Sequence, residues 1–365
     1  MLSNQYVFFA EESKDWKGAW GKLPKTTNAI TADTTVSQLR WSFDAGLKDG
    51  DMNKPLICER LAEHSSVEIL RYAHSHGYCG WRDVVCKAAA KGGSMFVQKW
   101  AHANGCPWDS TTCSEAAGSG HLDILQWARS KDFPWDGRTC SKAAFGGHLA
   151  VLQWARAHGC EWSHQRCESA AAGGHLDVLQ WARDNGAEWL KGTTSWAARR
   201  GDLEMLRWAR AQNSNGFDWQ SSTCSGAAAG GHLGIVQWAR ANGCDWNIET
   251  CCEAAEGGHL EVLKWARRNG CPWGSGVCAR AAKNGFSDVL KWSHGNGCVM
   301  DENTPTGAAA AGRLDILRWA RRNGCPWNSH TCTEAAGNGH FEILKWARRN
   351  GCPWDENTCA GTANG

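Results

Sequence analysis

The stretch GHLDILQWARSKDFPWDGRTC, residues 120–140, returns along this chain with small changes. It comes back as GHLAVLQWARAHGCEWSHQRC at residues 147–167 and as GHLDVLQWARDNGAEWLKGTT at residues 174–194. Self-similarity at a fixed spacing is the sequence signature of repeat architectures. The period of this line, and what varies within it, therefore decide both the fold and the search for a function.

The tryptophan of the WAR-like triplet marks the period. It stands at Trp100, Trp127, Trp154, Trp181, Trp208, Trp238, Trp265, Trp292, Trp319 and Trp346, in steps of 27 residues with one step of 30. A second marker, usually a cysteine, lies fourteen residues earlier. We predict about eleven repeats and a final half repeat over residues 53–365. Residues 1–52 lie outside the period, and we expect them to be partly disordered or to form a capping helix.

Each repeat predicts two short helices. In TCSEAAGSG, residues 112–120, Thr112 suits an N-cap and Glu115 completes a capping box. The Ala-Ala pair that follows lets neighbouring helices pack closely, and glycines end the helix. The next segment, HLDILQWARS, residues 121–130, has an apolar arc that is too wide for a helix with one buried face. A single repeat cannot bury that arc, but a stack of repeats can.

The order of these parts resembles the ankyrin repeat family: a Thr-capped helix with an Ala-Ala core, Gly-His, an LDILQWA helix and a glycine turn. The period is shorter than the 33 residues of the family, and cysteine mostly replaces the family's proline, which Pro305 restores in one repeat. The chain is similar to the ankyrin arrays of algae, protists and large DNA viruses. The resemblance implies an all-α, ankyrin-type α-solenoid of stacked helix-turn-helix repeats with short turns. It also implies a non-enzymatic scaffold that binds a protein partner through its concave face.

The cysteines invite a metal interpretation that their spacing does not favour. Cys106 and Cys113 are seven residues apart, as are five other pairs, whereas ligand pairs for zinc usually follow C-x2–4-C. Other repeats fill these two slots with Phe133, Ala187, Phe217, Thr194 and Pro305. A small apolar filler tolerates such exchange, and a buried thiol behaves as one. We predict structural thiols, no metal and no cofactor; a redox or metal-storing role is the alternative, with Cys251 and Cys252 the least explained pair.

The Gly-His histidines receive the same interpretation, because their slot holds Asp202, Phe286 and Arg313 in other repeats. This tolerance predicts a residue at a helix junction and not a catalytic or metal-binding array.

Composition excludes several function classes. The 365 residues include 24 Trp and 19 Cys, but the formal charge is only +2, so no global field attracts nucleic acid or an anionic membrane. We find no apolar run of about 18 residues, no secretory signal and no GxxxxGKS/T, HExxH or GxSxG motif. We therefore expect a monomer without enzymatic activity and without a membrane segment. We expect it in the reducing cytoplasm or the nucleus.

A recurring arginine follows the helix tryptophan by two residues: Arg129, Arg156, Arg183, Arg210, Arg240, Arg267, Arg321 and Arg348. The favoured interpretation is that these cations offset the helix macrodipole. The alternative function is nucleic-acid or phosphate binding along this basic edge. The turn tryptophans are flanked by aspartates and not by a basic groove, which disfavours a stacking platform for single strands.

Any specificity lies in the slots that vary, which are the three residues after the turn tryptophan and the first helix. Residues 188–206, EWLKGTTSWAARRGDLEML, depart most from the pattern and add tryptophan and arginine, which are favoured interface anchors. Either this repeat centres the interface or it is a drifted repeat without a role. The candidate partner-binding residues are Arg138, Lys142, His164, Leu190, Lys191, Trp196, Arg199, Gln220, Ile248 and Glu249.

Overall fold

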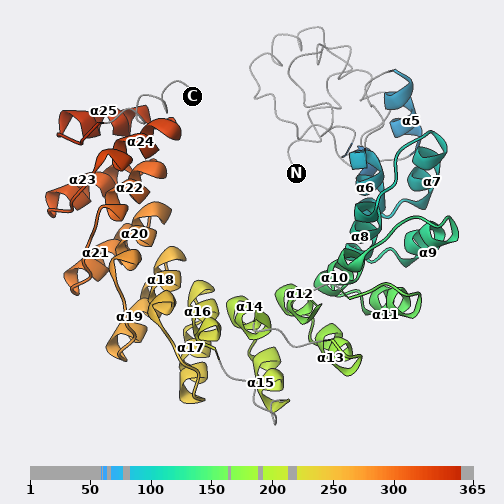
Figure 1. Ribbon diagram of the computed structural model, residues 1–365, viewed down its shortest axis with the longest axis horizontal. Helices are drawn as coiled ribbons and strands as arrows, with labels where there is room; N and C mark the ends of the chain where they lie inside the picture. Colours follow the sequence, from blue (N-terminus) through green and yellow to red (C-terminus); the bar gives the residue numbers. More distant parts are fainter. Residues whose placement is uncertain are drawn as a thin grey trace, which may run out of the picture. The chain divides into compact units, whose positions relative to one another are not determined.

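The computed structural model describes residues 59, 61–63, 67–76, 83–162, 166–187, 192–212 and 220–354. Within these residues every regular element is an α-helix (Figure 1), which confirms the predicted all-α repeat solenoid. The helices come in pairs, and we call the first of each pair the A helix and the second the B helix. The predicted domain boundary between residues 52 and 53, the N-terminal segment and the final half repeat after residue 354 lie outside the described residues.

The helices are short and uniform. The A helices are α6 (Asp83–Gly92), α8 (Ser110–Gly118), α10 (Gly137–Gly146), α12 (Arg166–Gly173), α14 (Gly192–Arg200), α16 (Ser221–Ala229), α18 (Ile248–Glu256), α20 (Ser275–Asn284), α22 (Asn303–Ala310) and α24 (Ser329–Gly337). The B helices are α5 (Val67–Ser75), α7 (Met95–Ala103), α9 (Leu122–Ser130), α11 (Leu149–Ala157), α13 (Leu176–Asp184), α15 (Leu203–Ala211), α17 (Leu233–Ala241), α19 (Leu260–Arg268), α21 (Ser287–Gly295), α23 (Leu314–Arg322) and α25 (Phe341–Arg349).

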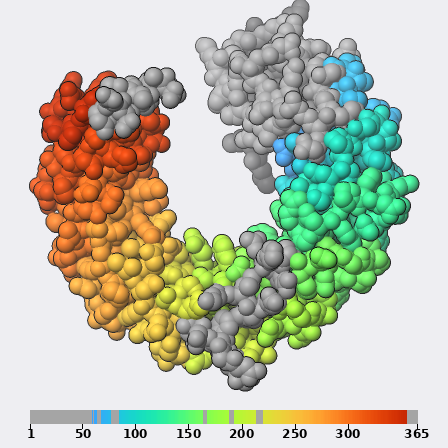
Figure 2. Space-filling model, viewed as in Figure 1, coloured from blue at the N-terminus to red at the C-terminus, as the bar shows by residue number. Residues whose placement is uncertain are grey.

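The chain divides into two compact units, residues 1–139 and residues 140–365. In the first unit α6 packs on α8, and the B helices α5, α7 and α9 follow one another. In the second unit the A helices from α12 to α24 form one continuous row, in which each packs on the next. Within that unit the A helices line the concave side of the row (Figure 1), and side chains fill the space between successive repeats (Figure 2).

The core of each repeat consists of small and branched residues on the inner sides of both helices. In the repeat of α18 and α19, Cys251, Ala254 and Ala255 from the A helix and Val262 and Leu263 from the B helix are almost fully buried. Small residues on the A helix allow the close approach of A helices that the row requires. The cysteines in the described part of the chain are all buried, as expected of fillers.

The A helix begins earlier than the sequence predicts. The N-cap is Asp109 and not Thr112: the Asp109 carboxylate accepts a hydrogen bond from the backbone N–H of Thr112 at 3.1 Å, and the helix begins at Ser110. Asn247 and Asn328 cap α18 and α24 in the same position. Aspartate and asparagine are better N-caps than threonine, which is fully buried here inside the first turn. The capping-box prediction was therefore wrong by three residues.

The Gly-His pair joins neighbouring repeats. Nε2 of His259 donates to the carbonyl oxygen of Ala229, at the end of the preceding A helix, at 3.1 Å. The ring lies against Gly231, which has a φ of 77°, and a Cβ there would stand 2.5 Å from the ring. Phe286 and Arg313 fill the same place in their repeats. The predicted role of the histidine at a helix junction is confirmed. The sequence did not indicate that its ring contacts the preceding repeat.

Candidate partner-binding surface

The exposed face of the A helices carries the residues that differ most between repeats. On α14 it presents Trp196, which is 44% exposed, and Arg199, whose side chain is 54% exposed. The same two slots on α16 hold Gly226 and Ala229. They hold Glu253 and Glu256 on α18, and Arg280 and Lys283 on α20. We call this surface of α14, α16, α18 and α20 the A face.

Charges on the A face are paired across helices. Arg280 on α20 donates to Glu249 at 2.6 Å, to Glu253 at 2.9 Å and to Glu256 at 3.0 Å, and all three glutamates lie on α18. These side chains remain partly exposed, so each pair contributes little to stability. Their main effect is geometric, because one guanidinium holds three carboxylates in a fixed row along α18.

Helix α16 lies between the tryptophan and this acidic row, and its surface is made of small residues. A Cβ on Gly226 would lie 2.4 Å from the carbonyl oxygen of Ser195, so α14 and α16 are in close backbone contact there. Because α16 presents no long side chain at this point, Nη1 of Arg199 reaches within 4.0 Å of the Glu253 carboxylate across two repeats. The A face therefore combines an exposed aromatic ring, a loosely held cation and a carboxylate row.

The residues predicted to bind a partner divide into those on the A face, one that belongs to the framework, and those that lie elsewhere or outside the described residues. Trp196, Arg199 and Glu249 lie together on the A face, and Ile248 is exposed at the start of α18. Gln220 is the N-cap residue of α16, and its carbonyl oxygen accepts from the Cys244 thiol at 3.3 Å, which makes it part of the framework.

The other predicted residues lie elsewhere or outside the description. His164, Leu190 and Lys191 are outside the described residues. Arg138 and Lys142 are exposed on α10.

Sequence reasoning missed the charged trio at the centre of the A face. Glu253 and Arg280 occupy the same slot of successive repeats, 27 residues apart, and opposite charges at that spacing were the signal. Glu256 joins them because it lies one helical turn further along α18.

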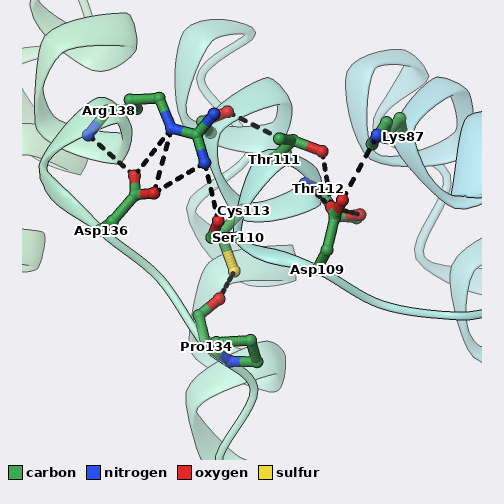
Figure 3. A network of polar contacts seen from close by, with 10 residues as sticks. Lys87, Asp109, Ser110, Thr111, Thr112, Cys113, Pro134, Asp136 and Arg138 are labelled. Atoms are coloured by element: carbon green, nitrogen blue, oxygen red, sulfur yellow. Dashed lines mark hydrogen bonds and ion pairs between the residues drawn. The ribbon is translucent and has the colours of Figure 1, made fainter.

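In the first compact unit, Arg138 is engaged by its neighbours (Figure 3). Its guanidinium donates to the Asp136 carboxylate at 2.8 Å and to the Ser110 hydroxyl at 2.9 Å. The hydrogen bond from Arg138 is the largest influence on the Asp136 carboxyl and outweighs its partial burial, so the pKa of Asp136 lies below its usual value. The same row continues with Lys87, whose ammonium lies 3.3 Å from the Asp109 carboxylate. This network links neighbouring A helices and orients the Arg138 guanidinium, while 59% of its side chain remains exposed.

The recurring arginines are built into the turns. The guanidinium of Arg240 lies 4.4 Å from the centre of the Trp246 ring and donates to the carbonyl oxygen of Cys244. The same arginine–tryptophan stacking is found for Arg129 with Trp135, Arg156 with Trp162, Arg267 with Trp273, Arg321 with Trp327 and Arg348 with Trp354. Four of these arginines also donate to a turn carbonyl and are half-buried, so they are poorly placed to track phosphates: Arg129, Arg156, Arg240 and Arg321. The exposed arginines of this edge are Arg183, Arg267 and Arg348 of the recurring series, together with Arg268, Arg322 and Arg349.

The two tryptophan series meet between repeats. Trp246 packs edge-to-face on Trp265 of the next repeat at 5.6 Å between ring centres, and Trp273 and Trp292 repeat this at 5.8 Å. Both members are half-buried. The two tryptophan series are therefore packing elements between repeats, although they are less buried than a core position. Within the described residues no group of three or more His, Cys, Asp and Glu side chains could hold a metal ion.

The chain matches no model of a known protein family and no curated protein. Among solved structures it is similar to the crystal structure of the pentatricopeptide repeat protein PPR10 in complex with an 18-nucleotide psaJ RNA element, with 13% identity and a TM-score of 0.37. A triple cysteine-to-serine variant of that protein, in complex with the same element, gives the same values. The match covers 99% of this chain and 63% of PPR10, so the chain spans less than two thirds of that protein. No helix in the described residues is both long and apolar enough to cross a membrane.

Proposed function

We propose that this chain is a non-enzymatic, ankyrin-type repeat scaffold that binds a protein partner through the A face. The observation that carries the proposal is Trp196, an aromatic ring left 44% exposed beside Arg199 where the next repeat has only Gly226 and Ala229. Tryptophan and arginine side chains on a rigid element are the residues that most often dominate binding energy at protein interfaces.

The charges around Trp196 favour a protein over a nucleic acid. The carboxylates of Glu249, Glu253 and Glu256 share this face with Arg199, Arg280 and Lys283, so it carries both signs and offers no continuous basic track to a phosphate backbone. A peptide can complement both signs, with one acidic residue for Arg199 and basic residues for the glutamates. The nucleic-acid alternative would have to use the separate edge of exposed arginines, which are Arg183, Arg267, Arg268, Arg322, Arg348 and Arg349.

Three further parts of the proposal rest on the framework. The ankyrin-type assignment is supported by the Ala-Ala A helix, the Gly-His junction and the tight glycine turn that recur in the described repeats. The many buried thiols support a reducing compartment, and we place the protein in the cytoplasm as a monomer. The absence of enzymatic activity is proposed on the sequence alone, which contains none of the motifs sought above.

The test is capture of partners by the full chain from native cell extract, with protein and nucleic acid both quantified at low and moderate salt. Each captured protein is then identified, purified and titrated against the wild-type chain and a Trp196→Ala/Arg199→Ala variant. We expect at least a tenfold loss of affinity with unchanged helicity, since two anchors each contribute about 1–2 kcal/mol. Phe96→Ala is the matched control, because Phe96 is an 81% exposed aromatic on the B helix α7.

Two outcomes would contradict the proposal. One is a purified partner whose affinity is the same for the double variant and the wild type. The other is capture of nucleic acid alone, lost steeply as salt rises, which would assign the function to the arginine edge.

A further inference from the structure

The cysteines pair in space at a spacing that the sequence does not suggest. Cys224 lies in the first turn of α16, and Cys244 lies in the turn that follows α17, twenty residues later. Their sulfur atoms are 3.4 Å apart, and both residues are fully buried. The seven-residue spacing that stands out in the sequence joins Cys244 to Cys251, which belongs to the next A helix.

The pairing recurs in other repeats. The side chains of five further pairs interact at the same two positions: Cys86 with Cys106, Cys140 with Cys160, Cys251 with Cys271, Cys278 with Cys298 and Cys332 with Cys352. In two of them the A-helix thiol donates to the carbonyl oxygen of the turn cysteine, from Cys140 to Cys160 at 3.9 Å and from Cys278 to Cys298 at 4.0 Å. Each pair joins the start of an A helix to the turn after its own B helix, and thus closes one helical hairpin. Six repeats therefore hold a buried dithiol.

We propose that these dithiols are oxidation sites, at which a peroxide converts each pair into a disulfide that closes its repeat. Sulfur atoms 3.4 Å apart are within van der Waals contact and need to approach by about 1.4 Å to reach the length of an S–S bond. The proposal concerns the framework of the repeats, so it stands or falls independently of the partner-binding surface.

The step balances with one peroxide per pair. The Cys244 thiolate attacks one peroxide oxygen, the O–O bond breaks, and Cys244 becomes a sulfenic acid while the first water leaves. The Cys224 sulfur then attacks the Cys244 sulfur, the S–O bond breaks, and the second water leaves with the formation of the disulfide. The two thiols supply the two electrons that reduce the peroxide, and their two protons end in the waters.

The environment distinguishes the two sulfurs. The hydrogen bond from Cys224 and the charge of Arg240 outweigh burial and lower the pKa of the Cys244 thiol, with the hydrogen bond the largest influence. The same hydrogen bond, together with burial, raises the pKa of Cys224. In this pair the turn cysteine is therefore the first to react, and the A-helix cysteine resolves it. In the pair of Cys332 and Cys352 the pKa of the turn thiol is raised instead, so there the A-helix cysteine reacts first. Because both are buried, the reaction proceeds through local opening of the turn and is slower than oxidation of an exposed thiol.

The chain contains its own controls. Cys325 has Pro305 at the A-helix position of its repeat, and positions 133 and 187 hold Phe and Ala where other repeats have the turn cysteine. These repeats are expected to form no closing disulfide. Of the 16 cysteines in the described part of the chain, twelve belong to the six pairs and four do not, namely Cys113, Cys167, Cys252 and Cys325.

The experiment uses the full, reduced chain in native buffer. It is treated with hydrogen peroxide, quenched, alkylated, digested and mapped by mass spectrometry without reduction. We expect the twelve cysteines of these six pairs to lose alkylation and to form cross-links at the twenty-residue spacing, each lighter by two hydrogen atoms and each reversed by dithiothreitol. Cys244→Ser should remove only the cross-link of Cys224, and Cys325→Ser should leave all cross-links in place.

Either of two results would overturn the proposal. One is a set of cross-links at the seven-residue spacing, such as Cys244 to Cys251. The other is a chain whose paired cysteines stay alkylatable, or reach sulfinic acid without cross-linking, under conditions that oxidise a small dithiol in the same tube. Cross-links that appear only after addition of urea count against it as well, because native proximity is the basis of the proposal.

Discussion

The junction between repeats allows a sharp energetic test, because one glycine and one histidine from neighbouring repeats share a single contact. Gly231 adopts a φ of 77°, and a Cβ there would lie 2.5 Å from the His259 ring. The ring in turn donates to the carbonyl oxygen of Ala229 at 3.1 Å. Gly231→Ala must therefore displace the ring and break that hydrogen bond, in addition to forcing alanine into the left-handed region.

The magnitudes follow from these two effects. His259→Ala removes the hydrogen bond to a partly buried carbonyl and should cost about 2 kcal/mol. Gly231→Ala should cost about 3 kcal/mol, of which about 1 kcal/mol is the left-handed conformation and about 2 kcal/mol the displaced histidine. In the double variant the histidine is already absent, so the alanine at position 231 displaces nothing. The total loss in the free energy of unfolding should therefore be about 3 kcal/mol, and not the sum of the two single losses, about 5 kcal/mol. The expected coupling is thus about 2 kcal/mol, within the range for residues in contact.

The assay is urea unfolding followed by circular dichroism, with equal slopes required for comparison. Gly243→Ala is the matched control: its φ is 83° and nothing lies within 4 Å of the Cβ position, so it should cost about 1 kcal/mol with or without His259. His259→Phe should be milder than His259→Ala, because phenylalanine fills this place in the repeat of α21. Additive costs for Gly231→Ala and His259→Ala, within about 0.5 kcal/mol, would refute the shared contact.

Three further predictions concern the framework. Arg240→Met should lower the free energy of unfolding by about 1–2 kcal/mol, because it loses both the stacking on the turn tryptophan and the hydrogen bond to the turn carbonyl; exposed Arg268→Met should change it by less than about 0.5 kcal/mol in the same urea experiment. Burial raises the pKa of Asp109, but hydrogen bonds from the next residues outweigh it and leave that pKa below its ordinary value. The stability that Asp109 contributes is therefore present above about pH 4 and lost as pH falls through the lowered pKa, and Asp109→Asn should remove this part of the acid-unfolding profile. Gly226→Ala should destabilise the chain by about 1–3 kcal/mol by clashing with a backbone carbonyl, whereas Gly234→Ala, with open space around it, should raise the thermal midpoint.

The repeat and its two helices could be predicted from the sequence. The constant period reveals the repeat, and the Ala-Ala and Leu-rich segments indicate the two helices. The N-cap was predicted at the wrong residue, because Thr112 and Asp109 are both of residue types that cap helices. Thr112 packs into the core, and this leaves Asp109 as the N-cap. The sequence also hid the cysteine partners. A seven-residue spacing is conspicuous in the chain, but the hairpin of each repeat brings residues twenty apart together.

The candidate surface was predictable only in part, for a related reason. Trp196 and Arg199 stand out because they break the repeat. The pairing of Glu253 with Arg280 does not stand out when the chain is read along one helix, because the partners lie on neighbouring helices. On a row of A helices, the lateral neighbours of a residue are those 27 positions before and after it.

That geometry also limits how specificity can be encoded here. A long side chain on one A helix can contact the next A helix in the row. It can contact the A helix after that only when the intervening helix has small side chains at this position. Arg199 meets Glu253 across α16 because Gly226 and Ala229 stand between them. The smallest repeat on the surface therefore determines which charges interact, and a bulky residue at position 226 would separate them even if both anchors were intact. On the binding surface that we propose, the unit that contacts a partner would be a set of three or more consecutive repeats. Repeats with small side chains would matter there as much as those that carry the tryptophan and the charges.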